Sequence, residues 1–250
     1  MHFNDKGYRR TMFDALDFSL LAFSSPGWGG ALLAGFLRSV ELAAGGYLLG
    51  IVIGLLGATA KLYGGRVLRD IAELYTLLIR AVPELVLMLL FYYVGTDLLN
   101  KLMGALGREG IDIDGLSAGI LVIGLVQGGY ATEVIRGAIR AVPPGQIEAA
   151  QAFGMSPLKV LHRVTLPAMT PHALPGMANL WMIATKDTAL LAVIGFSELT
   201  LVTKQAAAAT REYFLFFVAA GLLYLALTLI SNLGLRWLER RARRGLPAAA

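Results

Sequence analysis

Long apolar stretches dominate this chain and restrict it to a small set of folds. Five of them reach about 20 residues or more, which is the length that a helix needs to cross the hydrocarbon core of a membrane. Hydrophobic residues make up 56% of the 250 residues and charged residues 16%, whereas about a quarter of a typical soluble domain is charged. The sequence therefore predicts an all-α polytopic membrane protein with five transmembrane helices, at residues 31–60, 71–99, 116–135, 174–196 and 213–235.

The lysines and arginines predict how the chain is oriented, because loops rich in these residues stay on the cytoplasmic side. They gather after the first, third and fifth apolar stretches, as Lys61, Arg66 and Arg69, then Arg136, Arg140, Lys159 and Arg163, then Arg236, Arg240, Arg241, Arg243 and Arg244. We expect a single transmembrane domain of residues 1–250, with an outer N-terminal segment at 1–30 and a cytoplasmic C-terminus. The net charge of +5 fits this topology and does not indicate a nucleic-acid partner.

Small residues and missing residue types add two constraints. Glycines recur in the first apolar stretch (Gly45, Gly46, Gly50, Gly54, Gly57) and in the third (Gly119, Gly124, Gly128, Gly129). Glycine faces allow helices to approach closely in lipid, so these positions predict helix packing. The chain has no cysteine, which excludes disulfides and cysteine-ligated metals, and no metal site is predicted.

The polar segment 136–171 is the feature that a simple bundle does not need. Pro143 and Pro144 suit the first turn of a short helix, and Gly154 suits its left-handed end. Ser156 as N-cap and Pro157 at the first position then predict a second short helix, which Leu166–Pro167 is expected to end. Two short helices at an angle fit a groove on a partner or the lipid headgroups, and the pattern alone leaves both open.

The spacing within this segment resembles a known motif. Glu148-Ala149-Ala150 is followed after three residues by Gly154, then after nine by Val164, and after one more by Leu166-Pro167. This resembles the EAA motif of the permease subunits of bacterial ABC importers, with valine where isoleucine is usual. The resemblance implies a type I importer permease fold in which 136–171 is a cytoplasmic coupling loop. The residues implied to contact the ATPase are Glu148, Ala149, Ala150, Phe153, Gly154, Leu166 and Pro167.

Other segments resemble the permeases for polar amino acids. "IRAVPELVLMLLFYY" is similar to that subfamily's RGxP segment, with Ala81 where glycine is usual. "GGYATEVIRGAI" and "NLWMIATKDTAL" are similar to its signatures before the coupling loop and in the fourth helix. The finer resemblance is to the histidine/lysine/arginine/ornithine and octopine/nopaline permeases, which implies a basic amino acid or opine as substrate.

This resemblance also implies partners and a location. An importer of this kind has two permease subunits, two cytoplasmic ATPases and an extracytoplasmic binding protein, and lies in the bacterial inner membrane. The second permease is expected to be a paralogue rather than a second copy. The chain has no GxxxxGK[ST] phosphate-binding loop, so we expect no enzymatic activity and no cofactor in this subunit, with ATP and Mg²⁺ bound by the ATPase.

Charged residues at membrane depth are candidates for the substrate pathway. Lys186 and Asp187 lie in the fourth stretch, where the simpler interpretation is a helix break with paired charges. Glu133 and Arg136 are three residues apart, and a structural ion pair is the favoured interpretation there. Tyr130 lies with these two residues in the segment "GGYATEVIRGAI" and is a further candidate.

Arg80, Pro83 and Glu84 form a second candidate group, in the second stretch. Pro83 is expected to kink the helix. Glu84 is the candidate for recognising a cationic side chain, whereas the simpler interpretation pairs it with Arg80 one turn away. Glu41 and Asp97 are weaker candidates.

Two other functions compete with the importer hypothesis. The proline and charge interruptions are compatible with the broken helices of a secondary transporter or channel. The chain is also compatible with a structural half of an asymmetric permease pair that holds no substrate itself. The spacing of the EAA motif argues against the first alternative.

Overall fold

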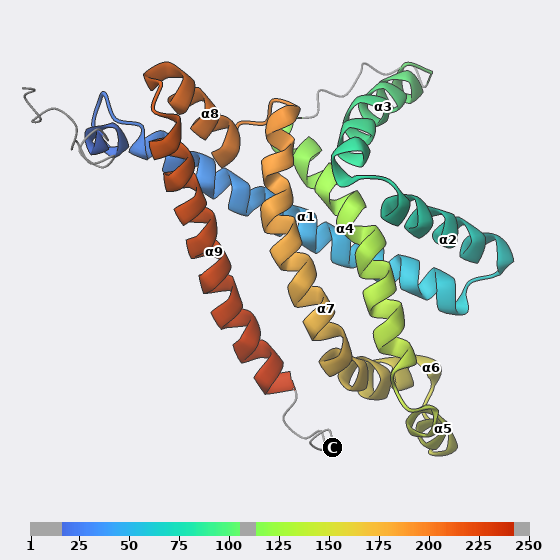
Figure 1. Ribbon diagram of the computed structural model, residues 1–250. Coiled ribbons are helices and arrows are strands. Elements are labelled where there is room, and N and C mark those ends of the chain that lie inside the picture. Colours follow the sequence, from blue (N-terminus) through green and yellow to red (C-terminus); the bar gives the residue numbers. More distant parts are fainter. Residues whose placement is uncertain (1–16, 106–113, 243–250) are drawn as a thin grey trace, which may run out of the picture.

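The computed structural model describes residues 17–105 and 114–242, and the described chain is almost entirely helical (Figure 1). Most of the outer N-terminal segment, 1–16, lies outside the described residues, as does the end of the chain. The helices are α1 (Gly29–Tyr63), α2 (Arg66–Ala81), α3 (Glu84–Ala105), α4 (Gly115–Arg140), α5 (Pro144–Ala152), α6 (Pro157–Val160), α7 (Leu166–Asp187), α8 (Leu199–Thr210) and α9 (Tyr213–Ala242). Short 3-10 turns lie at Phe18–Leu21 and Thr188–Val193, and a π turn at Leu161–Thr165.

The all-α membrane fold is confirmed, but the count of five spanning helices is not matched. Four described helices, α1, α3, α4 and α9, are long and apolar enough to cross a membrane. The predicted fourth span corresponds to α7 and the 3-10 turn after it. α7 is less hydrophobic than the other four helices, because it contains three prolines, His172 and Asn179.

The predicted second span, 71–99, is two helices and not one. The helix is interrupted at Val82 and Pro83, between the end of α2 at Ala81 and the start of α3 at Glu84. Pro83 has no N–H to donate, and proline disfavours helical backbone at the residue before it. Val82 accordingly has extended dihedrals, φ −103° and ψ 138°. The first piece, α2, is amphipathic, and the second, α3, is the apolar span.

A close seam between α1 and α4 organises the bundle. Glycines of each helix face side chains of the other: Gly46 lies against Ile123, Gly50 against Gln127 and Gly54 against Ala131. A Cβ added at any of these three glycines stands 2.4 to 2.8 Å from its neighbour, which is too close for real atoms. The predicted glycine faces are therefore the packing surface that joins these two helices.

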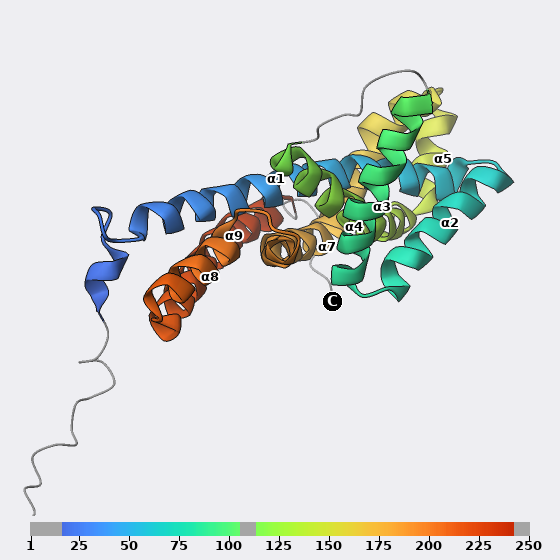
Figure 2. The same ribbon diagram turned by 90° about the horizontal axis from the view of Figure 1, so that it is seen from above.

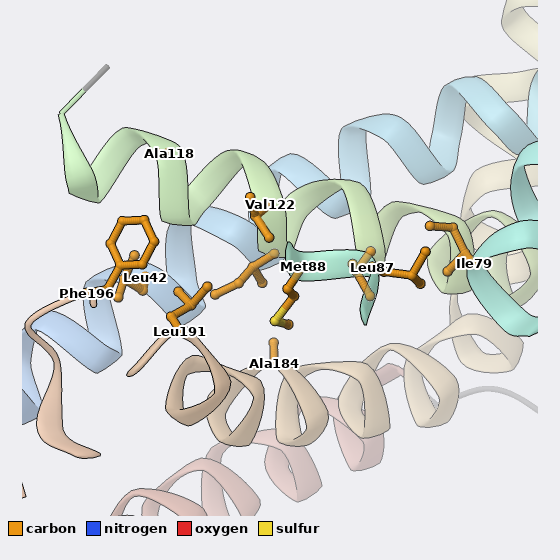
Figure 3. Packing of buried hydrophobic residues seen from close by; sticks show 11 residues of the cluster. Leu42, Ile79, Leu87, Met88, Ala118, Val122, Ala184, Leu191 and Phe196 are labelled. Atoms are coloured by element: carbon orange, nitrogen blue, oxygen red, sulfur yellow. The ribbon is translucent and has the colours of Figure 1, made fainter. Parts of the chain in front are cut away.

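The central core forms where other helices pack onto this seam (Figure 3). Val122 of α4 and Leu42 of α1 meet Met88 of α3, Ala184 of α7 and Leu191 of the following 3-10 turn. In Figure 2, α8 and α9 lie beside the first half of α1, and α2 lies beside its last turns. Large apolar side chains on the outside of α9, such as Leu229 and Leu233, are exposed, as expected for a helix in lipid.

We predict that the seam tolerates no added methyl group. Gly54→Ala is expected to lower the free energy of unfolding by about 1–3 kcal/mol, because the new Cβ collides with Ala131 and overpacks the interface. The measurement is thermal unfolding of the purified protein in detergent. The control is Gly221→Ala in α9, where a Cβ meets no atom within 4 Å. Equal stability of the two variants would contradict the role of the seam.

Candidate functional site

The short helix α5 ends in a well-defined turn. Gly154 has a φ of +74°, the left-handed conformation that glycine adopts without strain. The Gly154 N–H donates to the Gln151 carbonyl at 2.9 Å, and the Met155 N–H donates to the Ala150 carbonyl at 3.1 Å. These two bonds are the Schellman pattern of helix ends. The predicted role of Gly154 as the end of the first short helix is therefore confirmed.

The second short helix starts as expected but does not end where the sequence predicted. Pro157 begins α6, although the Ser156 side chain makes no capping hydrogen bond to it. The expected end at Leu166–Pro167 is wrong, because the π turn Leu161–Thr165 carries the chain straight into α7. The ring of Pro167 disturbs the carbonyl four residues earlier, which lies within this wider turn. The segment between α4 and α7 is therefore 141–165, shorter than the predicted 136–171.

The residues of the EAA motif form an exposed end of the bundle. Glu148, Ala149 and Gly154 are exposed, and so is Pro167. Phe153 is 85% exposed, a high value for a phenylalanine. Ala150 is buried and Leu166 half-buried, so these two hold the segment onto the bundle. Figure 1 shows α5 and α6 at the end of the molecule where α4 finishes and α7 starts.

A buried ionic cluster joins three helices near this end. Lys61 of α1 donates to the Glu133 carboxylate of α4 at 2.6 Å and to the Thr76 hydroxyl of α2 at 2.7 Å. Arg136 Nε donates to the same carboxylate at 3.1 Å. The side chains of Lys61 and Glu133 are only 9% and 19% exposed. The predicted pair of Glu133 and Arg136 is confirmed, and Lys61 is a third member that the sequence did not reveal.

A second polar cluster lies at the centre of the bundle, where α7 ends. Asp187 is buried, and its carboxylate accepts a hydrogen bond from Gln127 Nε2 of α4 at 3.0 Å. The Glu84 side chain, at the start of α3, lies close to both the Asp187 carboxylate and the Tyr130 hydroxyl. The structure thus brings three of the predicted pathway residues together and adds Gln127.

The simpler interpretation of Glu84 is wrong. Within residues 17–105 and 114–242, no ion pair joins Glu84 to Arg80. The break at Pro83 redirects α3, so the spacing of one helical turn no longer places these side chains together. Arg80 instead lines a cavity of about 700 Å³ with Lys61, Glu73 and Glu133.

The expected helix break at Lys186 and Asp187 is confirmed, since α7 stops at Asp187 and a 3-10 turn follows. The two charges are not paired with each other. Asp187 points inward to Gln127, whereas Lys186 is exposed.

Gln127 carries a further signal. Among the buried side-chain nitrogen and oxygen atoms of the described chain, its Oε1 is the one without a hydrogen-bond partner. Gln127 as a whole is 1% exposed. Buried polar atoms are nearly always paired, so an unpaired one beside two carboxylates marks this cluster as more than packing. A glutamine within an apolar helix was visible in the sequence, but its neighbours were not.

Glu198 is a charged residue that sequence reasoning missed. It is fully buried and precedes α8, accepting hydrogen bonds from the Ser39 hydroxyl at 3.1 Å, the Tyr224 hydroxyl at 3.1 Å and the Leu201 N–H at 2.9 Å. These contacts attach α8 to α1 and α9. Because it lies in the loop between two apolar stretches, its burial depends on the fold.

Comparison with known proteins identifies the family. Residues 46–244 match the family described as "Binding-protein-dependent transport system inner membrane component". The chain belongs to this family. The chain is 45% identical to the histidine/lysine/arginine/ornithine transport system permease protein of Salmonella typhimurium, and the match covers 89% of this chain and 98% of that relative. It is 40% identical to the nopaline transport system permease protein of Agrobacterium fabrum, and the match covers 92% of this chain and 99% of that relative.

Solved structures support the same family. An amino acid ABC transporter crystallised with histidines matches with a TM-score of 0.70 and 27% identity, over 86% of this chain and 95% of that chain. A methionine ABC transporter matches with a TM-score of 0.70 at 18% identity, over 88% and 99%, which concerns the fold alone. As a member of this family, the chain is an inner-membrane permease subunit and not an enzyme. A binding protein and a separate ATPase are the partners that family membership implies.

We predict that the buried ionic cluster of this permease is sensitive to the loss of its carboxylate. Glu133→Gln leaves the largely buried Lys61 ammonium without its carboxylate partner, with the Thr76 hydroxyl still accepting from it, which is expected to cost about 1.5–3 kcal/mol of stability. The control is Glu41→Gln, because the Arg38–Glu41 pair is 57% and 53% exposed and exposed pairs contribute about 1 kcal/mol or less. Thermal unfolding in detergent compares the two. A loss below 1 kcal/mol for Glu133→Gln would show that the cluster is not effectively buried.

Proposed function

We propose that this permease forms half of the translocation pathway of an ATP-driven importer for basic amino acids or opines. The observation that carries the proposal is the acidic cluster of Glu84 and Asp187 beside the unpaired Gln127 Oε1. The names of the similar permeases, which transport histidine, lysine, arginine, ornithine or nopaline, support the same substrate class.

The chemistry of this cluster suits a guanidinium or ammonium group. Two adjacent carboxylates repel each other and favour a cation between them. A guanidinium presents N–H donors in a planar fork that matches carboxylates in pairs. A guanidinium also supplies an N–H donor for Gln127 Oε1. The ionised Asp187 carboxylate cannot do so, because it only accepts hydrogen bonds. Arg80, Tyr130 and Lys186 are proposed to border the pathway.

We predict that Glu84→Gln raises the KM for arginine uptake roughly ten- to hundredfold, because a charge-assisted hydrogen bond contributes about 1.5–3 kcal/mol. The measurement is arginine uptake into vesicles that contain the complete importer. Glu84→Asp is expected to recover part of the affinity. Asp97→Asn in the same helix is the control, since that carboxylate is exposed and pairs with Lys101. Unchanged uptake by Glu84→Gln would refute the role of Glu84.

The exposed segment around α5 and α6 is proposed to dock into the cytoplasmic ATPase. The exposed Phe153 supplies an aromatic anchor, and the alanines beside it make α5 thin enough to lie in a groove. This proposal places the N-terminus outside and the C-terminus in the cytoplasm. ATP and Mg²⁺ are then bound by the ATPase dimer and this subunit carries no cofactor. ATP-driven closure of that dimer would move the segment and rock the helix bundle, which is a known class of switch.

The remaining partners follow from the same proposal. The binding protein docks on the outer face and releases its amino acid there. The second permease is proposed to be a paralogue and not a second copy, on the strength of the resemblance to the histidine and octopine systems. An importer with two different halves also allows the neighbouring subunit to bind substrate unequally.

We predict that Gly154→Val uncouples ATP hydrolysis from transport. A β-branched residue is strained at a φ of +74°, so the end of α5 must change shape. The expected result is an assembled complex with at least a tenfold lower ratio of arginine transported to ATP hydrolysed.

The matched variant is Gly154→Asn, because asparagine tolerates the left-handed conformation. It is expected to retain most of the coupling. Assembly and full ATP-driven transport in Gly154→Val would show that this segment does not transmit the motion.

A further inference from the structure

An apolar groove runs along the outside of the bundle between α1, α7 and α9. Its volume is about 480 Å³, and its lining includes Tyr47 of α1, Ala178 and Trp181 of α7, and Gly234 and Leu238 of α9. The lining surface is almost wholly apolar. Figure 1 shows the C-terminal half of α9 running alongside α7 at this level.

The groove opens toward a cluster of arginines at the end of α9. Its α9 lining ends at Leu238, and Arg241 lies one helical turn further on the same face. The Arg241 guanidinium is held over the Trp237 ring at 5.5 Å from the ring centre. Arg236 and Arg240 flank it and are exposed. Within the described chain, none of the four ion pairs involves these arginines.

The dimensions favour a lipid chain over a protein helix. The α9 lining, Ile230 to Leu238, extends for about 12 Å at the rise of a helix. A helix about 10 Å wide is much broader than an acyl chain, so a groove of about 480 Å³ would enclose only one side of it. An extended acyl chain, by contrast, lies lengthwise in such a groove.

We propose that this groove binds one acyl chain of an anionic phospholipid whose phosphate is bound by Arg241. The pairing of an apolar slot with a cationic end matches the two parts of this ligand, and basic pockets between membrane helices are a recognised mode of lipid binding. A guanidinium donates paired hydrogen bonds to a phosphodiester. Trp237 fixes the guanidinium at the level of the membrane interface, where aromatic residues gather.

The topological role of arginines does not explain the groove. Any basic residue in a cytoplasmic tail orients the chain, without regard to the helix face on which it lies. Arg241 lies on the face that carries the groove, and Gly234, which has no side chain, leaves that groove open. A Cβ at Gly234 meets no atom within 4 Å, so a leucine there has room at its base and is expected to extend into the groove.

The test measures lipid binding to the purified importer complex by native mass spectrometry, with phosphatidylglycerol and phosphatidylcholine of identical acyl chains. The wild type is expected to bind phosphatidylglycerol about fivefold more tightly, the effect of one basic residue near the surface. Arg241→Gln is expected to remove this preference. Gly234→Leu is expected to weaken the binding of both lipids at least fivefold.

Two controls separate these effects from general damage. Gly221→Leu changes the same helix where a Cβ also meets nothing within 4 Å, and Lys204→Gln removes a basic charge from α8. Both are expected to bind lipid as the wild type does.

Four outcomes would overturn the proposal. The first is wild-type binding of both lipids by Gly234→Leu, and the second is an unchanged lipid preference in Arg241→Gln. The third is release of the second permease by Gly234→Leu with lipid binding intact, which would assign the groove to a protein helix. Full competition by inorganic phosphate alone would likewise refute it, because the acyl chain would then contribute nothing.

Discussion

The contact between α1 and α4 is the interaction on which the rest of the structure depends. In lipid, apolar side chains gain little by leaving their surroundings, so helices associate through close packing. Gly46, Gly50 and Gly54 provide that closeness along one face of α1, and their partners recur at matching intervals along α4. The other elements then pack onto this pair, which also carries Lys61, Gln127 and Glu133. The seam therefore fixes the positions of the polar groups that the proposed transport function uses.

Three carboxylates enter this apolar bundle where helices break or end. Glu84 follows the break at Pro83, Asp187 ends α7, and Glu198 caps α8. In a regular helix the backbone N–H and C=O groups bond to one another. A charged side chain on such a helix is costly in the membrane unless it finds a partner. A break frees backbone groups and redirects side chains, so a carboxylate becomes tolerable where several elements meet. Figure 3 shows the apolar core that these helices share.

Much of the fold was visible in the sequence because it depends on local properties. Apolar length predicted α1, α4 and α9 within a few residues at most ends, and glycine spacing predicted the packing surface between α1 and α4. The turn at Gly154 followed from its preference for positive φ. Pro83 was expected only to kink a helix, and it separates two. Pro167 was expected to end the second short helix, but the π turn before it accommodates the proline ring and the helical chain continues into α7. Both errors arose because a proline's consequence depends on what the neighbouring backbone can accommodate.

The sequence by itself determined that this chain lies in a membrane, which stretches are helical, and that one polar segment carries the spaced motif of its family. These properties reside in composition, period and short-range turn chemistry. Only the tertiary structure decided which charges meet. Glu84 faces Asp187 and not Arg80, Lys61 completes the Glu133 pair, and Glu198 is buried from a loop position. The physical reason is that such contacts join residues up to 159 positions apart, and their geometry exists only once the helices have packed.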